Sequence, residues 1–268
     1  MDKNQIFTLW IGKPNKLLDL CVHSWVALKY KVNLYCDFDN REALKEAFAD
    51  CMDSVFFHHH SIVPLETDVK SVQAQSDIWR FCFLYKFGGT WLDGDMFLFK
   101  RLPEDDIIIS SEHTPQKGAY KTKGRTMVPN IGVLRLPKDS ELMRITLDQK
   151  ISWTSKSRVN KFMLKYQKLL RKNEDYMKFV AEPNVYCPVS WANSKQLYYL
   201  DEIPSGKYGI DQMSINDIIN NSIGVHLWNN FTYNKHKIDF NKVHQLSLFS
   251  KLLKYKPAEL ANSDDHLQ

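Results

Sequence analysis

Two aspartates separated by one glycine have the types and spacing that most directly suggest chemistry. Asp93-Gly94-Asp95 follows residues 90–92, an aromatic segment that we interpret as a strand. Residues two apart in an extended strand point the same way, so the two carboxylates can converge on one cation. Glycine between them would let a bulky group approach the backbone. Paired oxygen ligands suit Mn²⁺ or Mg²⁺, which would act as a Lewis acid on a diphosphate leaving group.

A helix over residues 72–87 precedes this pair and ends at Gly88-Gly89, a typical helix stop. Asp77 and Arg80 are three residues apart and share one face of that helix. Taken singly, they could be a surface ion pair worth about 0.3–0.5 kcal/mol, and the aspartates could be solvated turn residues. The whole pattern at fixed spacing favours a functional site. An EF-hand is disfavoured because residues 96–99 are apolar where that loop has polar ligands.

The elements around the pair predict an α/β fold. Strands at residues 5–10, 31–36 and 55–58 alternate with helices at 15–30 and 41–49, the order typical of a parallel sheet covered by helices. Further strands are expected at residues 96–99, 107–110, 131–136 and 224–228. Helices are expected to begin near residue 138, to cover the basic segment 155–179, and to close the chain at 242–253.

The block from Ser76 to Asp95 resembles the signature of the DXD-containing glycosyltransferases of the Och1-type mannosyltransferase and α-1,4-galactosyltransferase group. The glucosyltransferase domains of the large clostridial toxins share this outline. The resemblance covers residues 5–136 and fades beyond them. It implies a GT-A type, Rossmann-like domain, a nucleotide-sugar donor, and retention of anomeric configuration by front-face displacement. We therefore expect one domain over residues 1–268, with residues 1–136 holding donor and metal and 137–268 forming a helical, acceptor-side addition.

The resemblance also implies roles for individual residues. Trp10 would stack on the donor base beside Ile11 and Gly12, and Asp95 would bind the metal directly. Asp77 would bind hydroxyl groups of the ribose or the donor sugar, and Arg80 would reach the sugar or phosphate side. Residues expected to contact the nucleotide or its bound metal are Trp91, Asp93 and Gly94.

A late segment around His226-Leu227-Trp228 is similar to one that closes over the diphosphate in the same group. His226 is expected as a third metal ligand, with Trp228 and Asn230 touching the nucleotide. The plainer interpretation of His226 is a core histidine at a strand end. Asn130 is expected to face the donor sugar and acceptor, or else to be a turn residue before a strand. Glu112 and His113 could line the acceptor side.

Composition narrows the alternatives. The net charge of +5 comes without a dense basic motif, so no nucleic-acid partner is expected. The five cysteines form no C-x-x-C pair, which favours free thiols and argues against a zinc site. His58-His59-His60 is interpreted as a surface loop. No signal or membrane segment is recognised, so a cytoplasmic protein is expected. Its basic helices could make peripheral contact with the inner face of a membrane.

The sequence thus predicts a retaining enzyme that moves a hexose or N-acetylhexosamine from a UDP-sugar to a glycan or lipid-linked saccharide, in capsule or lipopolysaccharide synthesis. A GDP-mannose-dependent mannosyltransferase and an inactive nucleotide- or glycan-binding module remain alternatives. A metal-dependent phosphohydrolase is disfavoured because no second carboxylate cluster supplies a base.

Overall fold

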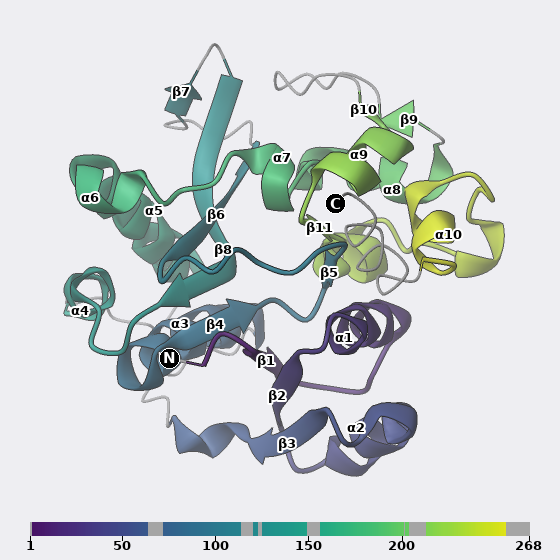
Figure 1. Cartoon of the computed structure of the whole chain (residues 1–268), viewed down its shortest axis with the longest axis horizontal. Helices are drawn as coiled ribbons and strands as arrows, with labels where there is room; N and C mark the ends of the chain where they lie inside the picture. The colour runs from purple at the N-terminus through teal and green to yellow at the C-terminus, as the bar shows by residue number, and fades with distance from the viewer. Residues whose placement is uncertain are drawn as a thin grey trace, which may run out of the picture.

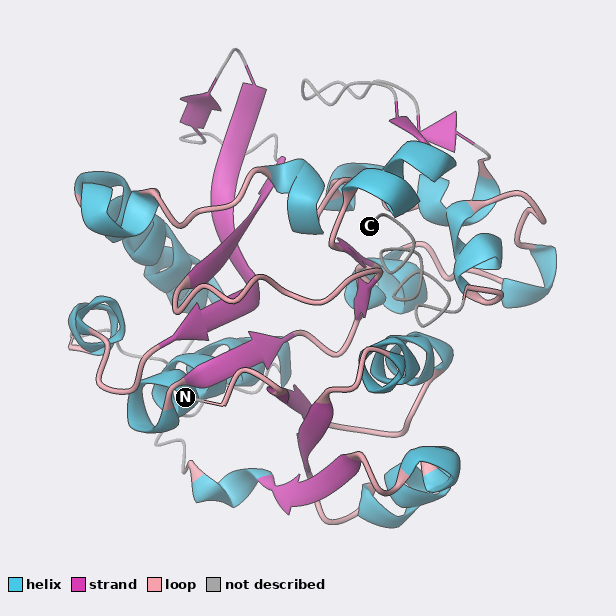
Figure 2. Cartoon of the chain, in the orientation of Figure 1, coloured by secondary structure: helices cyan, strands magenta, loops and turns pink. Residues whose placement is uncertain are grey.

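A seven-stranded mixed sheet forms the centre of the molecule, with helices on both sides (Figures 1 and 2). Its strand order is β3-β2-β1-β4-β8-β6, with β7 paired to β8. The computed structural model describes residues 2–63, 72–113, 120–122, 125–148, 156–200, 202–203 and 213–255. In this part of the chain no helix is long and apolar enough to span a membrane.

The N-terminal part has the β-α-β-α-β order that the sequence predicts. Strands β1 (Gln5–Trp10), β2 (Lys31–Cys36) and β3 (Val55–His59) are parallel, joined through helices α1 (Lys16–Ala27) and α2 (Arg41–Ala47). The side chain of Asn15 caps α1 by accepting hydrogen bonds from the backbone N–H groups of Leu17 and Leu18, at 3.0 and 3.1 Å. The histidine run is not a loop, since His58 and His59 end β3 and His60 begins a 3₁₀ turn, η2 (His60–Ile62).

Helix α3 (Val72–Phe87) leads into β4 (Gly89–Leu92), which lies parallel to β1 in the sheet. Beyond β4 the sheet is antiparallel, because β8 (Arg125–Leu136) pairs with β4 and also with β6 (Ile108–His113) and β7 (Tyr120–Thr122). Strands β6 and β8 are longer than expected. The α/β fold class is confirmed, and the antiparallel half is the part that the sequence pattern did not predict.

Alternating side chains divide the core between the two faces of the sheet. On β1, Ile6 belongs to a cluster with α1 and the C-terminal elements, whereas Leu9 joins a cluster with α3, α4 (Glu141–Leu147) and α5 (Lys156–Lys172). On β4, Leu92 and Trp91 divide in the same way. This is the period of two that a strand imposes on its side chains.

The C-terminal part is built from short elements. They lie on the α1 side of the sheet, except for α6, which packs beside α5 (Figure 1). The helices are α6 (Glu174–Met177), α7 (Pro183–Tyr186), α8 (Gln196–Tyr199), α9 (Ile215–Asn221) and α10 (Leu248–Leu252). The strands are β9 (Glu202–Ile203) paired with β10 (Met213–Ser214), and β11 (Gly224–His226) paired with β5 (Met96–Leu98). The expected closing helix over residues 242–253 is wrong in extent. Ser247 is the N-cap of α10, so the helix begins only at Leu248.

Candidate active site

The two aspartates lie in the connection between β4 and β5. Asp93 closes a tight turn, since its carbonyl oxygen accepts a 2.9 Å hydrogen bond from the backbone N–H of Met96. Its own N–H donates to the carbonyl of Gly132 on β8, also at 2.9 Å. The expectation of an extended strand through Asp95 is therefore wrong. The turn nevertheless brings the carboxylates of Asp93 and Asp95 together.

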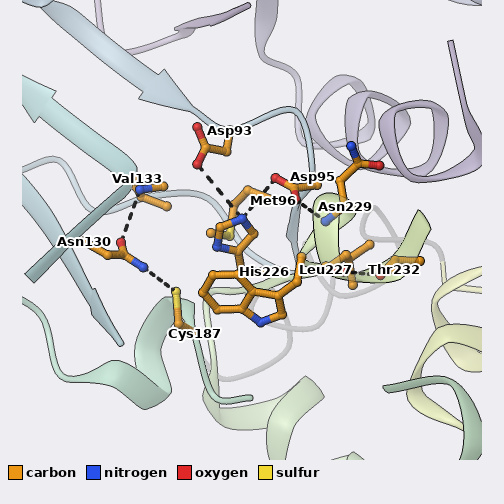
Figure 3. Close-up of polar contacts among 12 residues, drawn as sticks. Asp93, Asp95, Met96, Asn130, Val133, Cys187, His226, Leu227, Asn229 and Thr232 are labelled. Carbon is orange, nitrogen blue, oxygen red and sulfur yellow. Dashed lines mark hydrogen bonds and ion pairs between the residues drawn. The ribbon is translucent and has the colours of Figure 1, made fainter. Parts of the chain in front are cut away.

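Strand β11 brings His226 to this turn from the far end of the sequence. It pairs antiparallel with β5, with His226 opposite Met96, and the N–H of Leu227 donates to the carbonyl of Asp95 at 2.9 Å. Nε2 of His226 then lies 3.0 Å from Oδ1 of Asp95 and 4.0 Å from Oδ2 of Asp93 (Figure 3). One ligand atom from each of these three residues lies within 4.8 Å of the others. Among the described residues, one other group of this kind occurs, on α1 and the turn after α2.

Trp228 has a backbone conformation that is rare for a residue with a large side chain, with φ of 55°. Its ring stacks on His226 with 3.9 Å between ring centroids, and its indole N–H donates to the carbonyl of Val189 at 2.9 Å. The reversal of the chain at Trp228 aims the N–H of Asn229 at Oδ2 of Asp95, at 2.6 Å. Strain of this kind persists where surrounding contacts impose it, and it concentrates at functional sites.

Asp93 is held from behind by residues of α3 and β4. Its Oδ1 accepts hydrogen bonds from the indole N–H of Trp91, at 3.0 Å, and from the guanidinium of Arg80. Arg80 is buried and also donates to the carbonyl of Ile131 at 2.9 Å, while its guanidinium lies over the ring of Trp91. Trp91 is fully buried. Its place is therefore behind the carboxylates, where it orients Asp93, and a nucleotide in the cavity would not reach its ring.

A cavity of about 530 Å³ lies in front of the aspartates. Of the residues expected at the site, those that line it are Trp10, Ile11, Asp77, Arg80, Asp93, Gly94, Asp95, His226, Trp228 and Asn230. The cavity is also lined by Leu9, Val72, Gln73, Ser76, Asn229 and Phe231. The structure thus gathers the start of the chain, α3, the β4–β5 turn and the late segment around one space.

Gly12 and Asn130 lie outside this lining. Gly12 has φ of 112° and donates its N–H to Asp37, so it shapes the turn after β1. Asn130 is buried in β8, and its amide donates to Glu112 at 3.3 Å. The amide also donates to the thiol of Cys187 at 3.2 Å, the contact drawn in Figure 3. Its oxygen accepts from Ser110. Asn130 is therefore satisfied within a buried polar group next to the site.

Burial and neighbouring charges shift the acids of the site in different directions. Burial raises the pKa of Asp77 to about 6, with Arg80 opposing the shift. Burial likewise raises the pKa of Asp93, against the effects of Arg80 and His226. Burial would raise the pKa of Asp95 too, but His226 and the N–H of Asn229 lower it below its ordinary value. Perturbed acids that face one cavity are characteristic of functional sites.

Sequence reasoning missed three residues that position the site. Asn229 provides the backbone contact to Asp95, and its side-chain oxygen accepts from Asn15 at the start of α1, at 3.0 Å. Cys187 lies beneath the site against Asn130. The position of Asn229 beside His226-Leu227-Trp228 was a usable signal. Nothing in the local sequence distinguishes Cys187 or Asn15.

Two family models match the sequence, and each contains residues of the site. The glycosyltransferase sugar-binding region containing a DXD motif matches residues 19–114, and the α-1,4-glycosyltransferase conserved region matches residues 158–255. The first contains Asp93 and Asp95, and the second contains His226. The chain is a glycosyltransferase of the DXD type. A search of curated protein sequences gave no significant match.

Several solved structures are similar to this DXD glycosyltransferase. The PaToxG glycosyltransferase is 17% identical, with a TM-score of 0.46, over 64% of this chain and 70% of that one. Mouse xyloside xylosyltransferase 1 is 13% identical, with a TM-score of 0.41, over 67% of this chain and 85% of that one. The glycosyltransferase GlyE of Streptococcus pneumoniae TIGR4 is 9% identical, with a TM-score of 0.38, over 67% of this chain and 45% of that one.

A DXD glycosyltransferase implies a nucleotide-sugar donor, a glycan acceptor and a divalent metal. The ligand atoms at the site are of the kinds that such a metal binds. Two carboxylates and one imidazole, supplied by Asp93, Asp95 and His226, come within coordinating reach of one point.

Proposed function

We propose that this glycosyltransferase moves a hexose or N-acetylhexosamine from a UDP-sugar to a glycan or lipid-linked saccharide, with retention of configuration. The convergence of Asp93, Asp95 and His226 at the 530 Å³ cavity carries the proposal. These three residues would hold Mn²⁺ or Mg²⁺. Such an ion, when bound, neutralises charge on the diphosphate leaving group.

In this proposal the remaining residues bind and orient the donor. Trp10 presents its indole to the cavity and would stack on the base, with Ile11 beside it. Asp77, also on the wall, would accept hydrogen bonds from sugar hydroxyls, and Arg80 and Trp91 hold Asp93 in place. Trp228 and Asn230 would close the diphosphate side. The role of Asn130 would be exerted through Glu112, its neighbour.

A thermal-shift panel tests donor and metal together. UDP, GDP and CDP would each be added with and without Mn²⁺ to the wild type, to Asp95→Asn, and to Asp53→Asn, a control at an exposed turn residue. A ligand at about 100 times its Kd stabilises the folded state by about 2.7 kcal/mol. We expect a Mn²⁺-dependent rise in Tm with UDP in the wild type and the control, and its loss in Asp95→Asn.

The other outcomes separate the alternatives. A rise with GDP alone would favour the mannosyltransferase, and no rise with any nucleotide would contradict the proposal. A rise with UDP but no transfer or hydrolysis across a set of UDP-sugars would favour an inactive binding module. The anomeric configuration of a product, read by NMR, tests retention.

The proposal also includes peripheral contact with a membrane, which the exposed lysines of α5 would make. Lys165, Lys168 and Lys172 recur at helical spacing on its exposed surface beside Leu164, which is 49% exposed. Each lysine near an anionic bilayer contributes about 1 kcal/mol of attraction. Such contact would hold a cytoplasmic enzyme, and a lipid-linked acceptor, at the inner face of the membrane.

Vesicle sedimentation checks this contact. We expect binding to phosphatidylglycerol-containing vesicles, little binding to pure phosphatidylcholine, and weaker binding with added salt. The double variant Lys165→Glu/Lys168→Glu should lose it, whereas Lys29→Glu/Lys254→Glu, with the same change of charge at exposed positions elsewhere, should keep most of it. Equal loss in both variants would contradict a specific role for α5.

A further inference from the structure

A second group of metal-ligating side chains lies outside the active-site cavity, between α1 and the 3₁₀ turn η1 (Ala49–Cys51). It consists of His23, Asp50 and Cys51, whose ligand atoms all lie within 4.8 Å of one another. None of these residues lines the 530 Å³ cavity. The group supplies one imidazole nitrogen, one carboxylate and one thiol.

The imidazole of His23 is oriented as a metal-binding histidine is. Its Nδ1 lies 2.8 Å from the carbonyl oxygen of Asp19, which only accepts, so Nδ1 carries a proton and donates. Nε2 therefore faces Asp50, at 3.1 and 3.2 Å from its two oxygens, and the sulfur of Cys51, at 4.0 Å. A backbone carbonyl that fixes one ring nitrogen while the other faces the ligands is the usual outer-shell arrangement of a metal site.

The distances are close to those of a tetrahedral zinc site. Bond lengths of about 2.0–2.2 Å to nitrogen and oxygen and about 2.3 Å to sulfur place nitrogen and oxygen about 3.4 Å apart, and nitrogen and sulfur about 3.6 Å apart. The observed values from Nε2 are 3.1 Å to Asp50 and 4.0 Å to Cys51. Both distances from Nε2 thus lie within about 0.4 Å of the values for a tetrahedral site.

We propose that His23, Asp50 and Cys51 bind Zn²⁺, with water as the fourth ligand. A thiolate and an imidazole favour zinc over the harder Mn²⁺ and Mg²⁺, for which the oxygen-rich active-site group is suited. Asp19, His23 and Asp50 also line a cavity of about 820 Å³, so solvent reaches the fourth position. The ion would tie α1 to the segment before β3, and its role would be to stabilise the fold.

The competing occupant of this position is a proton. A protonated His23 would pair with Asp19 and Asp50, at 3.2 and 3.1 Å. Hydrogen bonding to Asp19 and then to Cys51 raises the pKa of His23 to about 11. Zinc binding would release protons from the imidazole and the thiol, so that affinity falls as pH is lowered.

Cobalt titration of the full chain distinguishes the two occupants. Reduced protein without chelator would be titrated with Co²⁺, whose sulfur-to-metal charge-transfer absorption reports thiolate coordination. We expect this band in the wild type, its loss in Cys51→Ser, and its retention in Cys82→Ser, a half-buried control cysteine. Asp95→Asn should also keep the band, because the active-site group has no sulfur ligand.

Zinc-dependent stability provides the second measurement. Zn²⁺ should raise the Tm of Cys82→Ser and of Asp95→Asn, and the rise should be smaller in Cys51→Ser and in Asp50→Asn. Absence of the charge-transfer band in folded wild-type protein, or its persistence in Cys51→Ser, would overturn the proposal and leave the protonated ion pair as the occupant.

Discussion

Gly94 separates the two carboxylates, and its missing side chain leaves room for the indole of Trp10. A Cβ at this position would lie 2.7 Å from Cε3 and 3.1 Å from Cζ3 of that ring. Trp10 also lines the cavity of about 530 Å³. Glycine at position 94 lets the ring of Trp10 pack against the turn between the two aspartates. This single contact therefore affects both the turn that carries the two carboxylates and the cavity wall that Trp10 forms. The group that approaches the glycine backbone is thus the protein's own tryptophan.

Glu112 gives the active-site region a pH-dependent stability. Burial raises its pKa from the ordinary 4.5 to about 7, with the hydrogen bond from Asn130 opposing the shift. The folded state then retains a proton that the unfolded chain releases near pH 4.5. The stabilisation is complete below that pH and is lost as pH rises through about 7.

Glu112→Gln should remove this contribution. We expect the free energy of unfolding of the wild type to fall relative to that of Glu112→Gln as pH rises from about 4.5 to about 7. Urea unfolding across this range, fitted at constant m, measures the difference. Parallel profiles for the two proteins would show that Glu112 ionises normally in the folded state.

At the scale of elements, the two-strand pairing of β5 with β11 positions His226 and the N–H of Asn229. Gly224 begins β11, and a Cβ there would lie 2.6 Å from the carbonyl oxygen of Phe97 and 3.0 Å from Leu98. Gly224→Ala must therefore push the strands apart. We expect a loss of about 1–3 kcal/mol in stability and weaker Mn²⁺-dependent nucleotide binding.

Gly132→Ala is a matched control for that change. Its Cβ would contact His226 at 3.4 Å, an ordinary separation. Thermal unfolding and the nucleotide panel would be run on both variants. Unchanged Mn²⁺-dependent binding in Gly224→Ala would show that the position of His226 does not depend on the pairing of β5 with β11.

Elements with strong periodicity are the ones that sequence predicts well. The bounds of β1, β2 and α3 agree with expectation, because alternation or helical spacing runs unbroken between clear stops. The antiparallel pairing of β8 depends on partners distant in sequence, which a local pattern does not contain. The closing helix predicted over residues 242–253 is too long, because the amphipathic pattern continues through residues that form turns before α10.

In the candidate site, too, local motifs predict some residues, whereas others are placed by packing between distant segments. Asp93, Asp95, His226 and the cavity wall were predicted from motifs, whereas the buried position of Trp91 and the contact of Asn229 arise from packing. The sequence disfavours a zinc site because its five cysteines form no C-x-x-C pair. His23 and Cys51 come from different elements and meet only through the fold, so spacing could not indicate them.

At the scale of the whole molecule, one hydrophobic cluster joins residues from both halves of the chain. It includes Ile6 of β1, Leu18 of α1, Val225 of β11 and Leu252 of α10. A core shared in this way supports the proposal of a single domain. We therefore expect one unfolding transition for the entire chain.

Two probes check this cooperativity. Far-ultraviolet circular dichroism follows helices throughout the chain. Tryptophan fluorescence follows the surroundings of the seven tryptophans, among which Trp25, Trp79 and Trp91 are fully buried in the first half of the chain. Their urea transitions should coincide. Separate midpoints would show that the C-terminal part unfolds as its own unit.

The pairing of β5 with β11 also sets the order in which the protein becomes an enzyme during synthesis. His226 follows Asp95 by 131 residues, so a ribosome completes both carboxylates long before the imidazole that joins them. A nascent or prematurely terminated chain that lacks β11 carries the DXD motif without the third ligand of its proposed metal site. Activity should therefore arise late in translation, and truncated products should not compete for the donor.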